Sequence, residues 1–250
     1  MKKLLALIIS LTLFIPSTSL AAIAFDAATG VESANGNASV THTATTTTNR
    51  LAILDVFTTG ADNLTTLTYG GTSVLANLVK KTQIGGGSTD WMYEFYMLNP
   101  PSGAQTVNAV SSNPSRTELL VTTYTGVSQT GFPDSSIVTT SAAQTSVTVN
   151  TTTTADNAWI HGMFINAAGS ASTAGANTTI RFNSGNSFPP SVNISVSTDT
   201  NGPMTPAGVY GQTVTSASPV IYGGIAVSFA PFTAAPAVTN QMQVIWMMED

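Results

Sequence analysis

Two histidines, His42 and His161, are the side chains suited to proton exchange near neutral pH, and the chain has no cysteine. His42 lies in a threonine-rich stretch, where we expect it on the solvent side of a strand. In an extended strand His161 shares a face with Trp159 and Met163, so we expect it to be at least half buried. Neither belongs to a Gly-x-Ser-x-Gly nucleophile elbow or a His-Glu-x-x-His zinc-binding helix. Their context predicts structural roles.

Glycoside hydrolysis would need two carboxyl groups about 5–9.5 Å apart. Glu94 and Glu118 fall on predicted strands that could be neighbours in a sheet. The sequence lacks the Glu-x-Asp-x-x-Glu spacing that places carboxylates of lectin-like glycosidases on one strand face. We therefore expect no catalytic residues, and a glycosidase-like enzyme is the least favoured alternative.

Asp55 interrupts the otherwise apolar stretch 51–57 and, with a period of two, points with Leu51, Ile53 and Phe57. Burial of an unpartnered carboxylate is costly. Either the strand meets solvent at Asp55, or the carboxylate meets a cation, a backbone donor or an arginine, for which the candidates are Arg50, Arg116 and Arg181.

Calcium is the only metal that the sequence suggests, through oxygen-rich loops at Asp62, Asp134 and Asp199. Calcium takes six to eight oxygen ligands, and no spacing in these loops supplies a full set. We expect ordinary turns there and no cofactor.

An aromatic strand is predicted at 91–98. Alternation places Trp91, Tyr93 and Phe95 on one face, and Glu94 and Tyr96 on the other. The residues Trp91, Tyr93, Glu94 and Tyr96, together with Asp55, are our candidate ligand-binding set, because sugar-binding sandwiches combine aromatic platforms with nearby carboxylates. If the three rings are simply core, Glu94 and Tyr96 would be the exposed pair.

The composition excludes several classes of function. Of 250 residues only 8% are charged, and the formal net charge is −5 with a mean hydropathy of +0.21. Disordered proteins combine low hydrophobicity with high net charge, and nucleic-acid-binding proteins have clusters of Lys and Arg. This composition therefore disfavours both classes. The absence of cysteine excludes disulfide frameworks and thiol nucleophiles.

The first 21 residues follow the pattern of a secretory signal peptide. Lys2 and Lys3 precede an apolar run of roughly 12 residues that ends at Pro16, with small residues before a cut after Ala21. The run is too short to span a membrane. We expect an exported protein, secreted or at a bacterial cell surface, that begins at Ala22 and has no membrane span.

Short apolar stretches, rich in Thr and Val and bounded by Gly, Asn, Pro or Ser, recur from 39 to 229. This pattern predicts an all-β fold, an antiparallel, jelly-roll-like β-sandwich over 22–232. Gly70-Gly71 predicts a tight hairpin turn, because glycine accepts a positive φ at both central positions.

The segment 39–57 aligns without gaps to 146–164, at an offset of 107 residues. Each half then ends in an apolar strand. Two weakly repeated halves forming the two sides of one sandwich would explain this pattern. The alternative is that threonine-rich strand–turn–strand segments resemble one another.

Several motifs of the first half resemble a known module: Asn49-Arg-Leu, Leu67-Thr-Tyr-Gly-Gly, Asn99-Pro-Pro-Ser-Gly and Tyr124-Thr-Gly-Val. They are similar to an uncharacterised β-sandwich module of about 200 residues from secreted bacterial and phage structural proteins. The resemblance covers roughly 34–232 and weakens in the second half. It implies a jelly-roll or lectin-like sandwich used for attachment or structure, and it carries over no catalytic residue.

Residues 233–240 form a predicted linker, followed by a C-terminal apolar strand. A strand apolar on both faces could complete its own sandwich or add to a neighbour's edge. Its candidate assembly residues are Val244, Ile245, Trp246, Met247 and Met248.

These observations predict a non-catalytic surface protein that acts in adhesion or binds a polysaccharide or cell-surface glycan. The alternative is a structural subunit of an extracellular or virion surface that assembles with copies of itself.

Overall fold

The computed structural model describes residues 21–234, except 86–87, 113–115, 132, 168, 170 and 185–192. All strand pairs are antiparallel, so the predicted all-β antiparallel sandwich is confirmed. The predicted signal peptide, up to residue 20, and the apolar segment Val244–Met248 lie outside the described residues.

The first half forms two facing sheets. One has the order β1-β9-β3-β7-β6 and the other β2-β8-β4-β5. The chain changes sheet at every connection except those between β4 and β5 and between β6 and β7, which is the order of a jelly roll. The elements are β1 (Ala24–Ser33), β2 (Asn37–Ala44), β3 (Leu51–Thr58), β4 (Leu64–Tyr69), β5 (Thr72–Ser73), the 3₁₀ turn η1 (Leu75–Asn77), β6 (Leu78–Gln83), β7 (Trp91–Leu98), β8 (Gly103–Ser111) and β9 (Thr117–Thr125).

The second half builds two layers from one bent sheet with the order β10-β15-β11-β14-β13, and β12 also pairs with β15. Its two long strands each run through both layers, and the pairing of β10 with β15 is irregular between Ser141 and Ser146. The elements are β10 (Ser135–Thr152), β11 (Trp159–Asn166), β12 (Ser172–Ala174), β13 (Thr179–Asn183), β14 (Ile194–Asp199) and β15 (Val209–Phe229).

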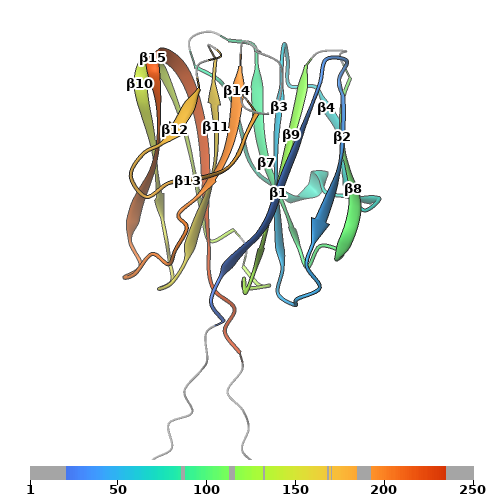
Figure 1. Cartoon of the computed structure of the whole chain (residues 1–250), viewed down its shortest axis with the longest axis vertical. Helices are drawn as coiled ribbons and strands as arrows, with labels where there is room; N and C mark the ends of the chain where they lie inside the picture. The colour runs from blue at the N-terminus through green and yellow to red at the C-terminus, as the bar shows by residue number, and fades with distance from the viewer. Residues whose placement is uncertain are drawn as a thin grey trace, which may run out of the picture.

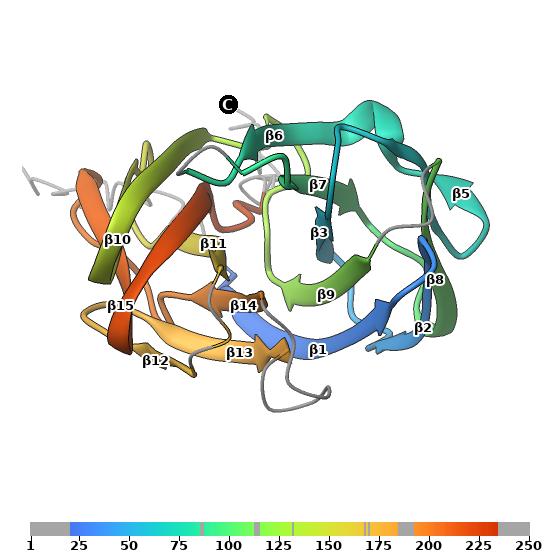
Figure 2. The same ribbon diagram turned by 90° about the horizontal axis from the view of Figure 1, so that it is seen from above.

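The halves stack through their inner layers, giving four layers from β2, β4 and β8 at one side to β10, β12 and β15 at the other (Figure 1). Each half therefore contributes two layers, and not one side of a single sandwich as the repeat suggested. The same succession is visible from above in Figure 2. The central strands β3 and β11 are buried at every residue, as expected for strands covered on both faces.

Four apolar clusters fill the spaces between the layers. Leu54 and Val56 of β3 pack toward β4 and β8, whereas Leu51 and Phe57 face the second half. On β11, Ile160 and Phe164 pack toward the outer layer of the second half.

The two halves share one pairing scheme, which favours a genuine repeat. Thr41 lies opposite Thr106, and Thr148 opposite Thr213, so both partners are shifted by 107 residues. In the next pair of strands, β3 and β11, the ungapped alignment of 39–57 with 146–164 is wrong by one residue. It matches Phe57 with Phe164, but these side chains lie in different clusters and face opposite sides. A shift of one residue moves a side chain to the other face of a strand.

The Gly70-Gly71 turn is confirmed, with φ of 55° and 81°, and joins β4 to β5. The described chain begins and ends at one pole, where the Ala21 amide donates to the Phe232 carbonyl at 2.9 Å. Figure 1 shows the start of β1 and the end of β15 close together at this pole.

Candidate functional site

His161 lies at the centre of the seam, the interface between the inner layers of the two halves. Its Nδ1 lies 2.9 Å from the Tyr124 hydroxyl, and its Nε2 lies 3.0 Å from Oδ2 of Asp55. Both partners belong to the first half, and all three side chains are buried. Asp55 faces the predicted side of its strand, but its partner is this histidine and not an arginine.

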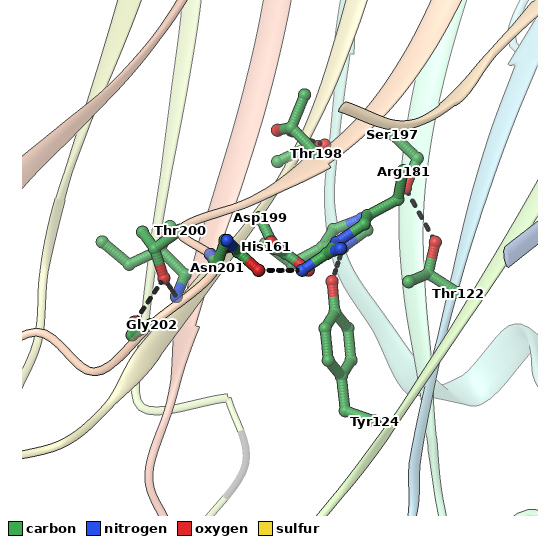
Figure 3. Close-up of polar contacts among 12 residues, drawn as sticks. Thr122, Tyr124, His161, Arg181, Ser197, Thr198, Asp199, Thr200, Asn201 and Gly202 are labelled. Carbon is green, nitrogen blue, oxygen red and sulfur yellow. Dashed lines mark hydrogen bonds and ion pairs between the residues drawn. The ribbon is translucent and has the colours of Figure 1, made fainter. Parts of the chain in front are cut away.

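A second group of polar side chains, Arg181, Asp199 and Asn201, extends from the seam to the surface. Arg181 donates through Nε to Asp199 at 2.6 Å and through a terminal nitrogen to Asn201 at 2.7 Å. Its guanidinium lies 4.2 Å from the centre of the Phe25 ring, in the first half. Figure 3 shows Arg181, Asp199 and Asn201 beside His161 and Tyr124.

Hydroxyls complete this part of the seam. Thr122 of β9 and Ser197 of β14 are hydrogen-bonded at 2.7 Å. Burial raises the pKa of the Tyr124 hydroxyl well above its ordinary value, and the negative charge of Asp199 adds to the increase. Tyr124 therefore remains an uncharged hydrogen-bonding group.

Glu94 lies directly opposite Asp55 in the pairing of β3 with β7. It is fully buried, so the expectation of an exposed Glu94 is wrong, and Tyr96 is only partly exposed. Burial, followed by the negative charge of Asp55, raises the pKa of the Glu94 carboxyl well above 4.5. Neither carboxyl oxygen has a hydrogen-bond partner among the described residues, so the protonated form is favoured.

Arg116 organises a separate acidic cluster at the seam. It lies 2.7 Å from Glu32 and also pairs with the buried Glu118. Burial raises the pKa of Glu118 to about 7, although the charge of Arg116 opposes the shift. Glu94 and Glu118 are on strands that flank β3 and do not pair with each other.

His42 is fully buried, so its predicted solvent position is wrong. Alternation along β2 places it inward with Ala38 and Ala44, where hydroxyls satisfy the ring. Its Nδ1 lies 2.8 Å from Thr29 Oγ1, and its Nε2 lies 3.1 Å from Thr123 Oγ1. Burial lowers its pKa from 6.5 to about 4, so the neutral ring is favoured.

The three rings of β7 share one face, as predicted, and form a ladder. The ring centres of Trp91 and Tyr93 are 6.3 Å apart, as are those of Tyr93 and Phe95. They pack against the core of the first half, and the Tyr93 hydroxyl donates to Asp62 at 2.8 Å. Ligand binding by Trp91, Tyr93, Glu94, Tyr96 and Asp55 stays a prediction.

Two of the proposed calcium loops have internal partners. Asp62 forms an ion pair with Lys81, and Asp199 with Arg181. Within the described ranges no group of three acidic, histidine or cysteine side chains is arranged to hold a metal ion.

The outer layers contrast with the seam because they carry no charge. The first outer layer consists of β2, β4, β5 and β8, and the second of residues 144–152, 209–216 and β12. No Asp, Glu, Lys or Arg occurs in either. Their outward positions carry mainly hydroxyl and amide side chains, and Thr148 and Thr213 are hydrogen-bonded at 2.7 Å.

No family model, curated protein or solved structure matches the chain. In the part of the chain that the structure describes, no helix has the length and apolar character to cross a membrane.

Proposed function

We propose that the protein is an exported, non-catalytic surface module that adheres to neutral glycans through its outer layers. The segregation of charge carries this proposal. The Asp, Glu, Lys and Arg side chains lie in the seam or at turns and inner-layer edges, whereas both outer layers expose hydroxyl and amide groups. Such a surface can hydrogen-bond to an uncharged polyhydroxylated polymer without removing water from an ion.

The geometry of the seam supports a non-catalytic role. Both ring nitrogens of His161 are occupied by protein partners, and the ring is inaccessible to solvent. A general base must lie within hydrogen-bond reach of its substrate. A substrate could reach His161 only if the inner layers separated, which would expose the apolar clusters around it.

Self-assembly is the second candidate function, and the edge of the second outer layer favours it. β10 lies at the end of its sheet order and contains neither a charged residue nor a proline. Edge strands usually carry such residues to prevent pairing with another chain. Residues 144–152 could therefore pair with an edge of a second copy.

Co-sedimentation with insoluble cellulose and chitin tests the first proposal. We expect the mature protein to bind at least one of these polymers, with affinity nearly unchanged from low salt to roughly 1 M salt, because screening acts on charges. Absence of binding to both would contradict glycan adhesion by this surface. Binding that disappears at high salt would contradict a charge-free contact. Concentration-dependent oligomers in analytical ultracentrifugation would support assembly.

A further inference from the structure

The outer part of β10, residues 144–152, forms a sheet edge with unpaired backbone groups. The Thr153 amide donates to the Gly208 carbonyl at 2.8 Å, so backbone hydrogen bonds from β10 to β15 recur at every second residue back to 147. The residues between them turn their N–H and C=O groups away from β15. This open edge consists of Ser146, Thr148 and Asn150.

The bonds on the far side of β15 agree with this assignment. Thr213 lies opposite Thr148 in the register, but both of its backbone groups are used on the side away from β10. Its amide donates to Thr178 Oγ1 at 2.7 Å, and its carbonyl accepts from the Gly175 amide at 2.8 Å. Among the described residues β15 is the only strand in the sheet order beside β10, so the open edge offers its donors and acceptors to an outside partner.

A row of evenly spaced backbone groups is matched by another extended strand. Charged residues or prolines normally prevent such pairing at an edge, and the whole of β10 has neither. The chain carries a formal net charge of −5, so two copies repel each other over much of their surface. The neutral strand β10 is a place where they can meet without opposing like charges.

The open edge is complementary to itself. Antiparallel pairing centred on Thr148 sets this residue opposite its own copy and Ser146 opposite Asn150, which makes all of them hydrogen-bonded pairs. Their hydroxyl and amide side chains lie together on the exposed face. On the other face Val147 meets Val149, and because both are buried, at 3% and 0% exposure, the apolar core continues across the contact.

The edge strand of the first outer layer, β2, fits a second copy less well. The Asp26 carboxylate accepts a hydrogen bond of 3.0 Å from the Thr45 amide directly after β2, which places an acidic group at the end of this edge. Antiparallel self-pairing centred on Thr41 would also set Val40 opposite His42, an apolar side chain against a polar one. The edge of β10 has neither feature.

We propose that the open edge pairs with the same edge of a second copy, antiparallel and centred on Thr148. The second outer layers of the two copies then form one continuous sheet across a twofold axis. Because both copies use the same surface, the contact is closed and gives a dimer, not a filament. This inference rests on self-assembly, the second candidate function, and adds its partner, orientation and register.

Charge substitutions at Thr148 test this register. Thr148→Lys or Thr148→Glu sets two like charges opposite each other in the dimer, whereas a mixture of the two variants sets opposite charges together. Thr213→Lys and Thr213→Glu are matched controls, because they remove the same hydroxyl pair but place the charge on β15, one strand away from the contact. Circular dichroism and thermal unfolding would verify that every variant is folded.

Sedimentation equilibrium of the mature protein over a range of concentrations measures the monomer–dimer equilibrium. We expect the unmodified protein to reach the mass of two copies. Each Thr148 variant alone should dimerise at least roughly tenfold more weakly, because like charges face each other across the pair. The equimolar mixture should recover the dimer, and the Thr213 controls should stay within about twofold of the unmodified protein, because solvent screens charges at that separation.

The outcomes separate the inference from the function on which it rests. A protein that stays monomeric at every concentration would overturn both self-assembly and this dimer. Assembly that persists in both Thr148 variants, or depends on residues 241–250 instead, would leave self-assembly standing and overturn pairing through the open edge. Open-ended growth in mass, or a mixture that does not recover the dimer, would overturn the twofold register.

Discussion

His161 and Asp55 join the two halves through a hydrogen bond of 3.0 Å between side chains that are 0% and 1% exposed. They come from the central strands of the two inner layers, 106 residues apart in the chain. Removing one member of a buried polar pair leaves the other without compensation. This contact is therefore a sensitive probe of the seam.

We expect His161→Ala to destabilise the protein by about 3–5 kcal/mol, because the buried Asp55 carboxylate loses its partner and a cavity forms. The double variant Asp55→Leu/His161→Leu should recover a large part of that loss. Urea unfolding followed by tryptophan fluorescence would measure both. A loss below about 1 kcal/mol in the single variant would show that the seam does not depend on this pair.

Glu94 should make the protein less stable as pH rises. Its folded-state pKa lies well above the ordinary 4.5, so its contribution is fully present below pH 4.5 and is lost as pH rises through the folded pKa. Glu94→Gln removes this ionisation and should flatten the decline on the alkaline side. Urea midpoints across pH would measure it, and an unchanged pH profile would contradict a buried, proton-binding Glu94.

Glu118 should also make the protein less stable as pH rises, over a narrower pH range than Glu94. Its pKa rises from 4.5 to about 7, so the stability it contributes at low pH should be lost between these values. Glu118→Gln should remove this part of the profile while Glu94 still titrates. If the two variants had identical profiles, the assignment of separate windows to the two carboxyls would be wrong.

His42 should act in the opposite direction. Its pKa falls from 6.5 to about 4 on folding, so its contribution is present above pH 6.5 and is lost as pH falls toward 4. His42→Gln keeps a side chain able to bond Thr29 or Thr123 and removes the titration. We expect its unfolding midpoint to depend less on pH between 4 and 6.5, and an unchanged slope would contradict the assignment.

Features that depend on local pattern were predictable from the sequence. The alternation in β3 correctly oriented Asp55, and alternation in β11 predicted the burial of His161. The burial of Glu94 was not predictable in this way, because the second half covers a face of β7 that one half alone would leave open. The threonine-rich stretch around His42 favours a solvent-facing side chain, but the period of two in β2 places His42 inward with Ala38 and Ala44.

The long strands of the second half were also missed, for a physical reason. The short apolar stretches near 146–150, 209–215 and 225–229 indicate separate strands, whereas β10 and β15 continue through both layers. The linking part of β10, Thr140-Ser-Ala-Ala-Gln-Thr145, has no apolar alternation because it passes from one layer to the next. Tyr124 and Asp199 escaped notice as seam residues because their partners lie in the other half.

The turn between β4 and β5 provides the last test, at Gly71. Its φ is 81°, and no atom lies within 4 Å of an added Cβ, so backbone conformation alone limits substitution there. Asparagine tolerates positive φ, whereas a β-branched residue does not. We expect Gly71→Asn to be nearly neutral and Gly71→Val to cost roughly 1–3 kcal/mol in urea unfolding. Equal stability of the two variants would show that the turn does not require a left-handed residue.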